Sequence, residues 1–241
     1  MASGDERAAG FAERRALLAL GAAAGLVVVA RARAEGMLQQ LSEGEASAGL
    51  RAALERGAGV AVDLLGKADG FWGNDRVRIP LPDWLHKAEG TLRMLGRGKD
   101  VDELHVGINR AAEQAVPAAR PLLVDAVHGM SVQDAKGILT GGDDSVTRFF
   151  ESHTRTPLGE RFLPIVSGVT QKIGLARRYD QIVDRVGSLG LVKPDETRIE
   201  PHVTAKALDG LFLMIGDEER KIRADPVGTG SAILKKVFGA L

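Results

Sequence analysis

Helix-stopping and helix-capping residues divide most of this chain into segments of helical length, and this punctuation constrains the fold more than any other feature. Glycines, prolines and short Asp, Ser or Thr clusters separate stretches in which apolar residues recur every three or four positions. Residues 50–65 are one example, with leucines and alanines along one face. Nothing in the sequence resembles a series of strands. The pattern therefore predicts an all-α fold, a single multi-helix domain of about eight to ten helices.

The same signals place the helix boundaries. Ser131 and Asp134 match a capping box, Asp100 is expected to cap a helix, and Pro117 is expected to break one. The expected helices cover residues 47–65, 82–95, 100–128 with the break at Pro117, 131–140, a segment ending near 153, a segment from Pro157 kinked at Pro164, 176–186, 201–215, 216–223, and a last amphipathic stretch after Pro226.

One segment departs from helical periodicity. Residues 76–81, which we call the strap, alternate between polar and apolar side chains, so the apolar ones share one side. Pro80 and Pro82 disfavour a helix here, so the strap is expected to be extended, with Pro82 in the first turn of the next helix. An envelope assembly or scaffold factor acting through the strap is one hypothesis. It requires a contiguous apolar surface patch there.

Residues 1–34 have the three-part layout of an export signal. Arg14 and Arg15 precede an apolar run over 16–30, and small residues in A-x-A spacing lead up to Ala34. The run is shorter than the roughly 18 apolar residues that a membrane span needs, and no later segment approaches that length. The arginine pair favours the twin-arginine route over the general secretory route. We expect cleavage near Ala34 and a periplasmic protein; the alternative is an uncut N-terminal membrane anchor, with the protein facing the periplasm.

Composition excludes several classes of site and partner. The sequence has no cysteine, so it has neither disulfides nor thiolate metal ligands. Residues 1–34 carry five arginines and three acidic residues, which leaves 27 basic and 29 acidic residues in the remainder. A net charge this close to zero does not indicate binding to nucleic acid, and it does not indicate a basic patch that binds a membrane. Because only 4% of the residues are aromatic, the core is expected to be aliphatic.

Familiar motifs of catalysis and cofactor binding are missing from the sequence. The chain has no G-x-S-x-G element, and residues 96–99 lack the glycine spacing of a phosphate-binding loop. Its five histidines are scattered, and none lies in an H-E-x-x-H pattern. We therefore expect no metal and no cofactor. Whether the protein is an enzyme is undecided, with a non-catalytic role favoured.

Three polar groups stand among apolar residues and are the candidate sites. In the first, Asn109, Arg110 and Glu113 lie within about one turn of a predicted helix, and His105 is on the same face. They form either an ordinary surface ion pair beside a polar face, or a carboxylate, an amide and a guanidinium that converge on a pocket.

The second group is Lys206 and Asp209, in the most apolar predicted helix. Asp209 is expected near the core, where a carboxylate needs a cation or donors, which Lys206, Arg78 or Arg110 could supply. The group is either a satisfied structural network or an acid with a shifted pKa in a pocket. Gly210 would allow a close approach to a neighbouring element in both cases.

The third group is the segment 140–145, in which two glycines precede Asp143 and Asp144. It is either a nest or loose cation site, or the end of one helix followed by an aspartate cap on the next. Glu218 and Glu219, in contrast, are expected on a solvated face.

Six blocks of sequence, in order, are similar to those of a known family. They are GKADGF from Gly66, VRIPLP from Val77, NRAAE from Asn109, DAKGILTGGD from Asp134, KALDGLF from Lys206 and LKKVFG from Leu234. With these blocks the chain resembles the bacterial domain of unknown function family 4197 over residues 44–239. The resemblance implies a helical exported domain and no particular activity. Trp72 stands where an aliphatic residue is more usual, and residues 228–230 are unusually rich in glycine.

Two further hypotheses about function follow. The favoured one is an exported, non-catalytic protein that binds a small ligand or an envelope partner. The rival is a hydrolase or lyase in which Glu113 or Asp209 acts as acid and base, while Arg78 or Arg110 holds an anionic substrate. If these four side chains line one open cavity, a site is favoured. If they are dry and paired with one another, they are structural.

Overall fold

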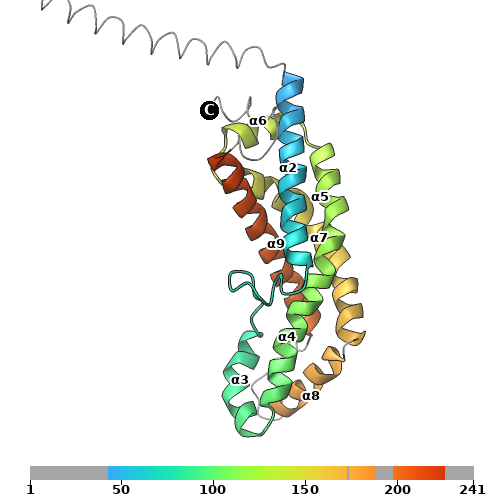
Figure 1. Ribbon diagram of the computed structural model, residues 1–241. Coiled ribbons are helices and arrows are strands. Elements are labelled where there is room, and N and C mark those ends of the chain that lie inside the picture. Colours follow the sequence, from blue (N-terminus) through green and yellow to red (C-terminus); the bar gives the residue numbers. More distant parts are fainter. Residues whose placement is uncertain (1–42, 173, 188–197, 226–241) are drawn as a thin grey trace, which may run out of the picture. The chain divides into compact units, whose positions relative to one another are not determined.

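The computed structural model describes residues 43–172, 174–187 and 198–225 (Figure 1). Every regular element in this part of the chain is a helix, which confirms the all-α prediction. Residues Leu50–Asp225 form one compact unit; the other comprises residues 1–49 and 226–241, of which 43–49 are described and begin the first helix. The predicted export signal and the amphipathic stretch after Pro226 lie outside the described residues.

Most of the connections between helices that the structure describes are short, and the loop that contains the strap is the long one among them. Their bounds are α2 Glu43–Gly66, α3 Asp83–Met94, α4 Gly98–Ala115, the 3-10 turn η1 Val116–Ala118, α5 Ala119–His128, α6 Val132–Thr140, α7 Ser145–Lys172, α8 Leu175–Gly187 and α9 Ile199–Ala224.

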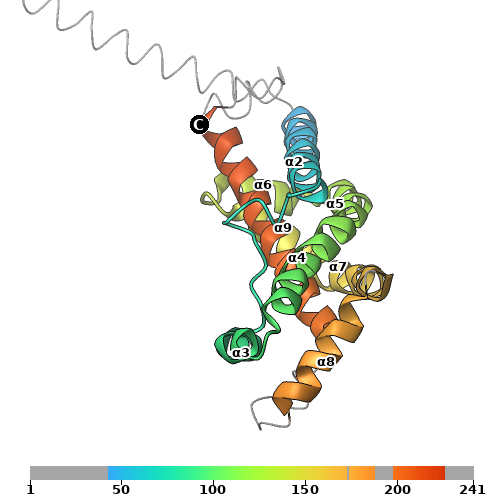
Figure 2. The same ribbon diagram turned by 60° about the horizontal axis from the view of Figure 1, so that its bottom comes forward.

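The centre of the larger unit is built from α7, α9 and α4. The pair α7 and α9 has the most extensive contact between helices, and α4 packs against both. At one end, α3 and α8 lie on either side of α4, as both views show (Figures 1 and 2). Leucine, isoleucine, valine and alanine fill most of this core, and the rings of Phe71, Phe150 and Phe162 are fully buried within it. The expectation of an aliphatic core is therefore confirmed.

Several local predictions hold. Ser131 caps α6, since its hydroxyl accepts from the N–H of Asp134 while the Asp134 carboxylate accepts from the N–H of Ser131. Pro117 lies in η1, which interrupts the helical run between α4 and α5. Each of these signals works through neighbours in sequence, and packing elsewhere does not oppose it.

Other boundaries were predicted wrongly. Pro157 and Pro164 both lie inside α7, which runs without interruption where two helices were expected. An internal proline costs about 3 kcal/mol, but α7 buries Leu158 and Phe162 on the two turns around these prolines, which offsets that cost. Asp100 does not cap α4: the helix begins at Gly98, and the Asp100 carboxylate lies 2.6 Å from Nε of Arg97.

Candidate functional site

In the strap, residues 76–81, Arg76 and Val77 belong to a turn whose N–H groups bond back to Asn74, so the expected extended conformation fails there; residues 78–81 are free of turns. Val77, Ile79 and Leu81 are buried, whereas Arg76, Arg78 and Pro80 are exposed. The predicted alternation is confirmed. The apolar surface patch that the assembly-factor hypothesis required at the strap is not there, because all three apolar side chains face the core.

Side chains of α4 and α9 bond to the backbone of the strap, as a neighbouring strand would do in a sheet. The fully buried amide of Asn109 accepts from the N–H of Ile79 at 2.8 Å and donates to the Ile79 carbonyl at 3.0 Å. Nε2 of His105 lies 3.0 Å from the same carbonyl, and Nε2 of His202 lies 2.8 Å from the carbonyl of Pro80. Asn109 thus makes the pair of bonds that a β-strand neighbour would make.

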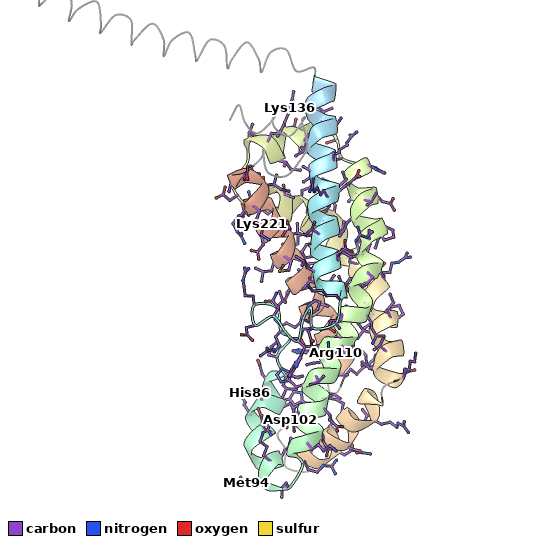
Figure 3. All side chains as sticks on the ribbon, viewed as in Figure 1. His86, Met94, Asp102, Arg110, Lys136 and Lys221 are labelled. Carbon is purple, nitrogen blue, oxygen red and sulfur yellow. The ribbon has the colours of Figure 1, made fainter. Side chains whose placement is uncertain are left out.

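Glu113 organises the loop that leads into the strap. It is only 4% exposed, and its Oε1 accepts from the N–H groups of Phe71 and Trp72 at 3.1 and 3.2 Å. Its Oε2 accepts from Arg110 at 2.8 Å, and Arg110 also bonds Asp69 at 2.7 Å. Figure 3 shows Arg110 on α4 beside this loop. Both oxygens of Glu113 therefore accept hydrogen bonds. The first group is not the expected surface ion pair, because Asn109 and Glu113 are buried and bond the backbone of the strap and of the loop.

A pocket of about 210 Å³ lies between the strap and α9, and we call it the strap pocket. Its walls come from five consecutive strap residues and from one face of α9. The lining residues are Arg76, Val77, Arg78, Ile79, Pro80, Lys206, Asp209, Gly210 and Leu213.

Gly210 is required where the pocket backs onto the core. A Cβ at this position would lie 2.8 Å from the Phe71 ring and 3.4 Å from Val77. The close approach predicted for Gly210 is therefore to the loop and the strap, which lie against α9 at this point.

Asp209 was expected near the core, and that prediction is wrong. Its side chain is 44% exposed and bonds Arg155 of α7 and, at 3.3 Å, Lys206. Partial burial alone would raise the pKa of Asp209, but the hydrogen bonds from the two cations outweigh it, and the pKa lies below its usual range. The apolar residues around Asp209 predicted burial on every side of α9. One face of α9 is nevertheless exposed to solvent beside the strap, and Asp209 lies on that face.

Trp72 orients Arg78 at the rim of the pocket. Nε of Arg78 donates to the Trp72 carbonyl at 2.6 Å, and the guanidinium lies 5.0 Å from the centroid of the Trp72 ring. The remaining ionic contact of Arg78 is with Asp75 at 2.7 Å. The ring at this unusual position thus has a local role, because it lies against the guanidinium, whereas the main-chain carbonyl would be supplied by any residue.

The structure brings together only some of the predicted site residues. Arg78, Lys206 and Asp209 share the strap pocket. Glu113 and Arg110 do not line it, so the four side chains of the enzyme hypothesis do not share that cavity. Asn109 supports the pocket from behind by holding Ile79.

Asp143 belongs to another part of the unit. It is exposed in the turn between α6 and α7 and does not line the strap pocket, and Asp144 pairs with Arg148 one helical turn away. In the residues that the structure describes, no group of three or more acidic or histidine side chains is arranged to hold a metal ion.

Glu218 and Glu219 were expected on a solvated face, and that prediction is wrong, because both are buried. Glu219 has the more extensive contacts. It is 3% exposed, and it accepts from the N–H groups of Val146 and Thr147 at 3.1 Å each. Arg223, one turn later on α9, donates to it at 3.0 Å. The signal available in the sequence was the Glu-to-Arg spacing of four residues, which is common on surfaces and does not reveal burial.

The fold and the pocket define an all-helical protein with a small, charged pocket at the strap. Residues 40–239 match the family described as Protein of unknown function (DUF4197), and the chain belongs to this family. No curated protein matches the chain, and no solved structure does. Among the described helices none is long and apolar enough to cross a membrane.

Proposed function

We propose that this chain is an exported, non-catalytic protein that binds a small ligand in the strap pocket. The observation that carries the proposal is the convergence of Arg78, Lys206 and Asp209 on one pocket, from two elements that are remote in sequence. Polar groups that fix the orientation of a ligand at a concave site are typical of small-molecule binding.

The proposal of a binding role rests on the state of the two candidate acids. Glu113 is 4% exposed, accepts from two backbone N–H groups and an arginine, and does not line the strap pocket, so it is not placed to contact a ligand there. The pKa of Asp209 is lowered by Arg155 and Lys206 despite its partial burial. A general acid or base at neutral pH requires a pKa raised toward 7. Asp209, with its lowered pKa, does not support the hydrolase or lyase hypothesis, and Glu113 lies outside the lining of the strap pocket.

Export is part of the proposal because of the N-terminal sequence. Arg14, Arg15 and the apolar run over 16–30 have the layout of a signal, with a periplasmic destination. An N-terminally anchored form facing the periplasm is the alternative, and it would leave the strap pocket in the same compartment.

Native mass spectrometry of the protein isolated from its own periplasm tests the proposal. We expect a small-molecule adduct on the wild-type protein and loss of that adduct in the Arg78→Gln, Lys206→Gln double variant. The double variant Lys99→Gln, Arg148→Gln removes two exposed cations away from the pocket and is the matched control. An adduct of protein size would instead favour an envelope partner, and a wild-type protein without any adduct would contradict the proposal.

A further inference from the structure

We infer that the ligand of the strap pocket is a small organic anion, a carboxylate on a short aliphatic body, held by Arg78 and Lys206. This inference rests on the proposed binding function and adds the chemical class of the ligand. It also assigns a positioning role to Arg155, which lies outside the pocket lining and controls the charge of Asp209.

The charge of the pocket favours an anion. Three of its lining residues are cations, Arg76, Arg78 and Lys206, and one is an acid, Asp209. The charge of Asp209 is already matched from behind by Arg155, which is not a lining residue. Arg155 is itself anchored by Glu151 at 2.8 Å and stacks over the Phe212 ring, 5.6 Å from its centroid. With Asp209 neutralised, the pocket presents a net positive charge to a ligand.

Arg76 contributes less of that charge than the other two cations. Its guanidinium is bonded to Asp217, which is mostly buried and also bonded by Arg220. The Arg76 hydrogen bond is the main reason that the pKa of Asp217 lies below its usual range. Arg76 makes two bonds to Asp217, whose side chain is 11% exposed, and is therefore committed to it. Lys206 makes a single 3.3 Å bond to the more exposed Asp209. Arg78 pairs with the exposed Asp75, so Arg78 and Lys206 are the two cations that a ligand can recruit.

Arg78 is organised to receive an anion. Its Nε and the face of its guanidinium are held by Trp72, so the terminal nitrogens have a defined direction. Their present partner, Asp75, is 86% exposed, and such a pair is worth little in water. A ligand carboxylate can replace Asp75 at little cost and gain from the fixed arginine.

The size and the apolar lining of the pocket restrict the body of the ligand. At the roughly 30 Å³ that one water occupies, the pocket holds about seven waters. That is below the range of about 300–1,000 Å³ for drug-sized ligands, so the pocket encloses only a small group, and the remainder of a larger ligand would lie outside it. Leu213 is a half-exposed apolar side chain at this pocket, next to Gly210, which has none. A short aliphatic chain would cover Leu213.

Calorimetric titration of the purified full chain with butyrate tests the ligand class. Three matched probes accompany it. Butyramide lacks the negative charge of butyrate, butylammonium carries a positive charge instead, and inorganic phosphate is an anion without the aliphatic chain. We expect butyrate to bind at least about tenfold more tightly than each of the three, since charge-assisted bonds to a fixed arginine are strong. Tighter binding of any of these three probes would overturn the inference, as would the absence of butyrate binding.

Charge variants test the roles of the side chains. Arg78→Gln and Lys206→Gln should each weaken butyrate binding about tenfold, whereas Asp209→Asn should strengthen it about threefold. Arg155→Gln should also weaken butyrate binding. Without Arg155, Asp209 is paired with Lys206 alone, so Lys206 is less available to the ligand. Arg148→Gln, on the same helix and exposed, is the control and should change nothing. Thermal melts confirm that each variant is folded.

The outcome for Asp209→Asn separates this inference from the function on which it rests. Weaker ligand binding in Asp209→Asn would mean that the carboxylate contacts the ligand, and the anion class would be wrong while a binding site at the strap remained. In another outcome, butyrate does not bind while native mass spectrometry shows another small molecule whose binding depends on Arg78. In that case the proposed chemical class of the ligand is wrong and the proposed binding function stands. If the periplasmic protein carries no small molecule, the proposed function fails as well.

Discussion

At the scale of single residues, Asn109 does the work that a strand neighbour does in a sheet. Its amide bonds both the N–H and the carbonyl of Ile79, and it is buried completely. A third bond to the carbonyl of His105 fixes the amide on α4. Because an unpaired buried backbone group is costly, this one side chain permits a segment with no strand beside it to lie against the core.

Asn109→Ala should lower the free energy of unfolding by about 2 kcal/mol, because the N–H of Ile79 then has no partner in the core. Urea unfolding followed by circular dichroism measures the change. Gln114→Ala, an exposed amide on the same helix, is the control and should stay within about 0.5 kcal/mol of the wild type. A loss no larger than that of the control would show that water replaces the amide.

We expect two histidines to make the stability of the same segment sensitive to pH. Burial lowers the pKa of His105 below its usual value, against the hydrogen bond to Ile79, and burial does the same to His202, against the bond to Pro80. Arg78 and Lys206 lower these pKa values further, while Glu89, Asp102 and Asp83 raise them and are outweighed.

The sign of the effect on stability follows from proton binding. Between the ordinary histidine pKa of about 6.5 and the lowered folded-state pKa, the unfolded chain binds more protons than the folded chain. The free energy of unfolding is therefore highest above about pH 6.5 and falls as the pH drops toward the folded-state pKa. Urea midpoints measured across this range should fall with pH.

His202→Gln keeps a donor near the Pro80 carbonyl and removes the titrating group, so its urea midpoint should fall less steeply with pH than that of the wild type. His128→Gln removes an exposed histidine that bonds Glu55 and not the strap, and it is the control for the loss of one imidazole. An unchanged slope in His202→Gln would assign the acid sensitivity to other groups.

At the scale of helices, two ways of capping an N-terminus occur side by side. Helix α6 is capped by its own Ser131 and Asp134, from neighbouring positions. The first N–H groups of α7 are accepted by Glu219, which comes from α9, more than 70 positions away. An acid at a helix N-terminus also interacts favourably with the helix dipole. The carboxylate of Glu219 therefore joins the two helices that form the centre of the unit.

Glu219→Ala should cost about 3 kcal/mol, because it leaves Arg223 and two N–H groups without their buried partner. Ser131→Ala removes only a local cap and should cost about 1 kcal/mol. Urea unfolding of the two variants measures the difference. Equal losses would indicate that the tertiary cap contributes no more than a local one.

At the scale of the whole molecule, the export route can be tested through the arginine pair. Replacing Arg14 and Arg15 together by lysine keeps the charge that the general secretory route needs but removes the address of the twin-arginine route. We expect the full-length precursor to accumulate in the cytoplasm, measured by fractionation and immunoblotting. Processing at the wild-type rate would instead favour the general route.

Local rules predicted those parts of the fold that depend on neighbours in sequence. The alternation along the strap, the capping box at Ser131 and the interruption at Pro117 each follow from residues within about four positions of one another. The same rules failed at Pro157, because the packing of α7 against α9 outweighs a local preference that would have ended the helix.

The sequence by itself determined the helical class of this protein, its family and the alternation of buried and exposed side chains along the strap, because periodicity, capping and proline geometry act over a few residues. Only the tertiary structure decided which acids are buried. Asp209 lies on the open side of α9 with Arg155, whereas Glu219, ten positions later on the same helix, is enclosed beside α7. Burial depends on what packs against a side chain, and in both cases that partner lies more than 50 positions away in the sequence.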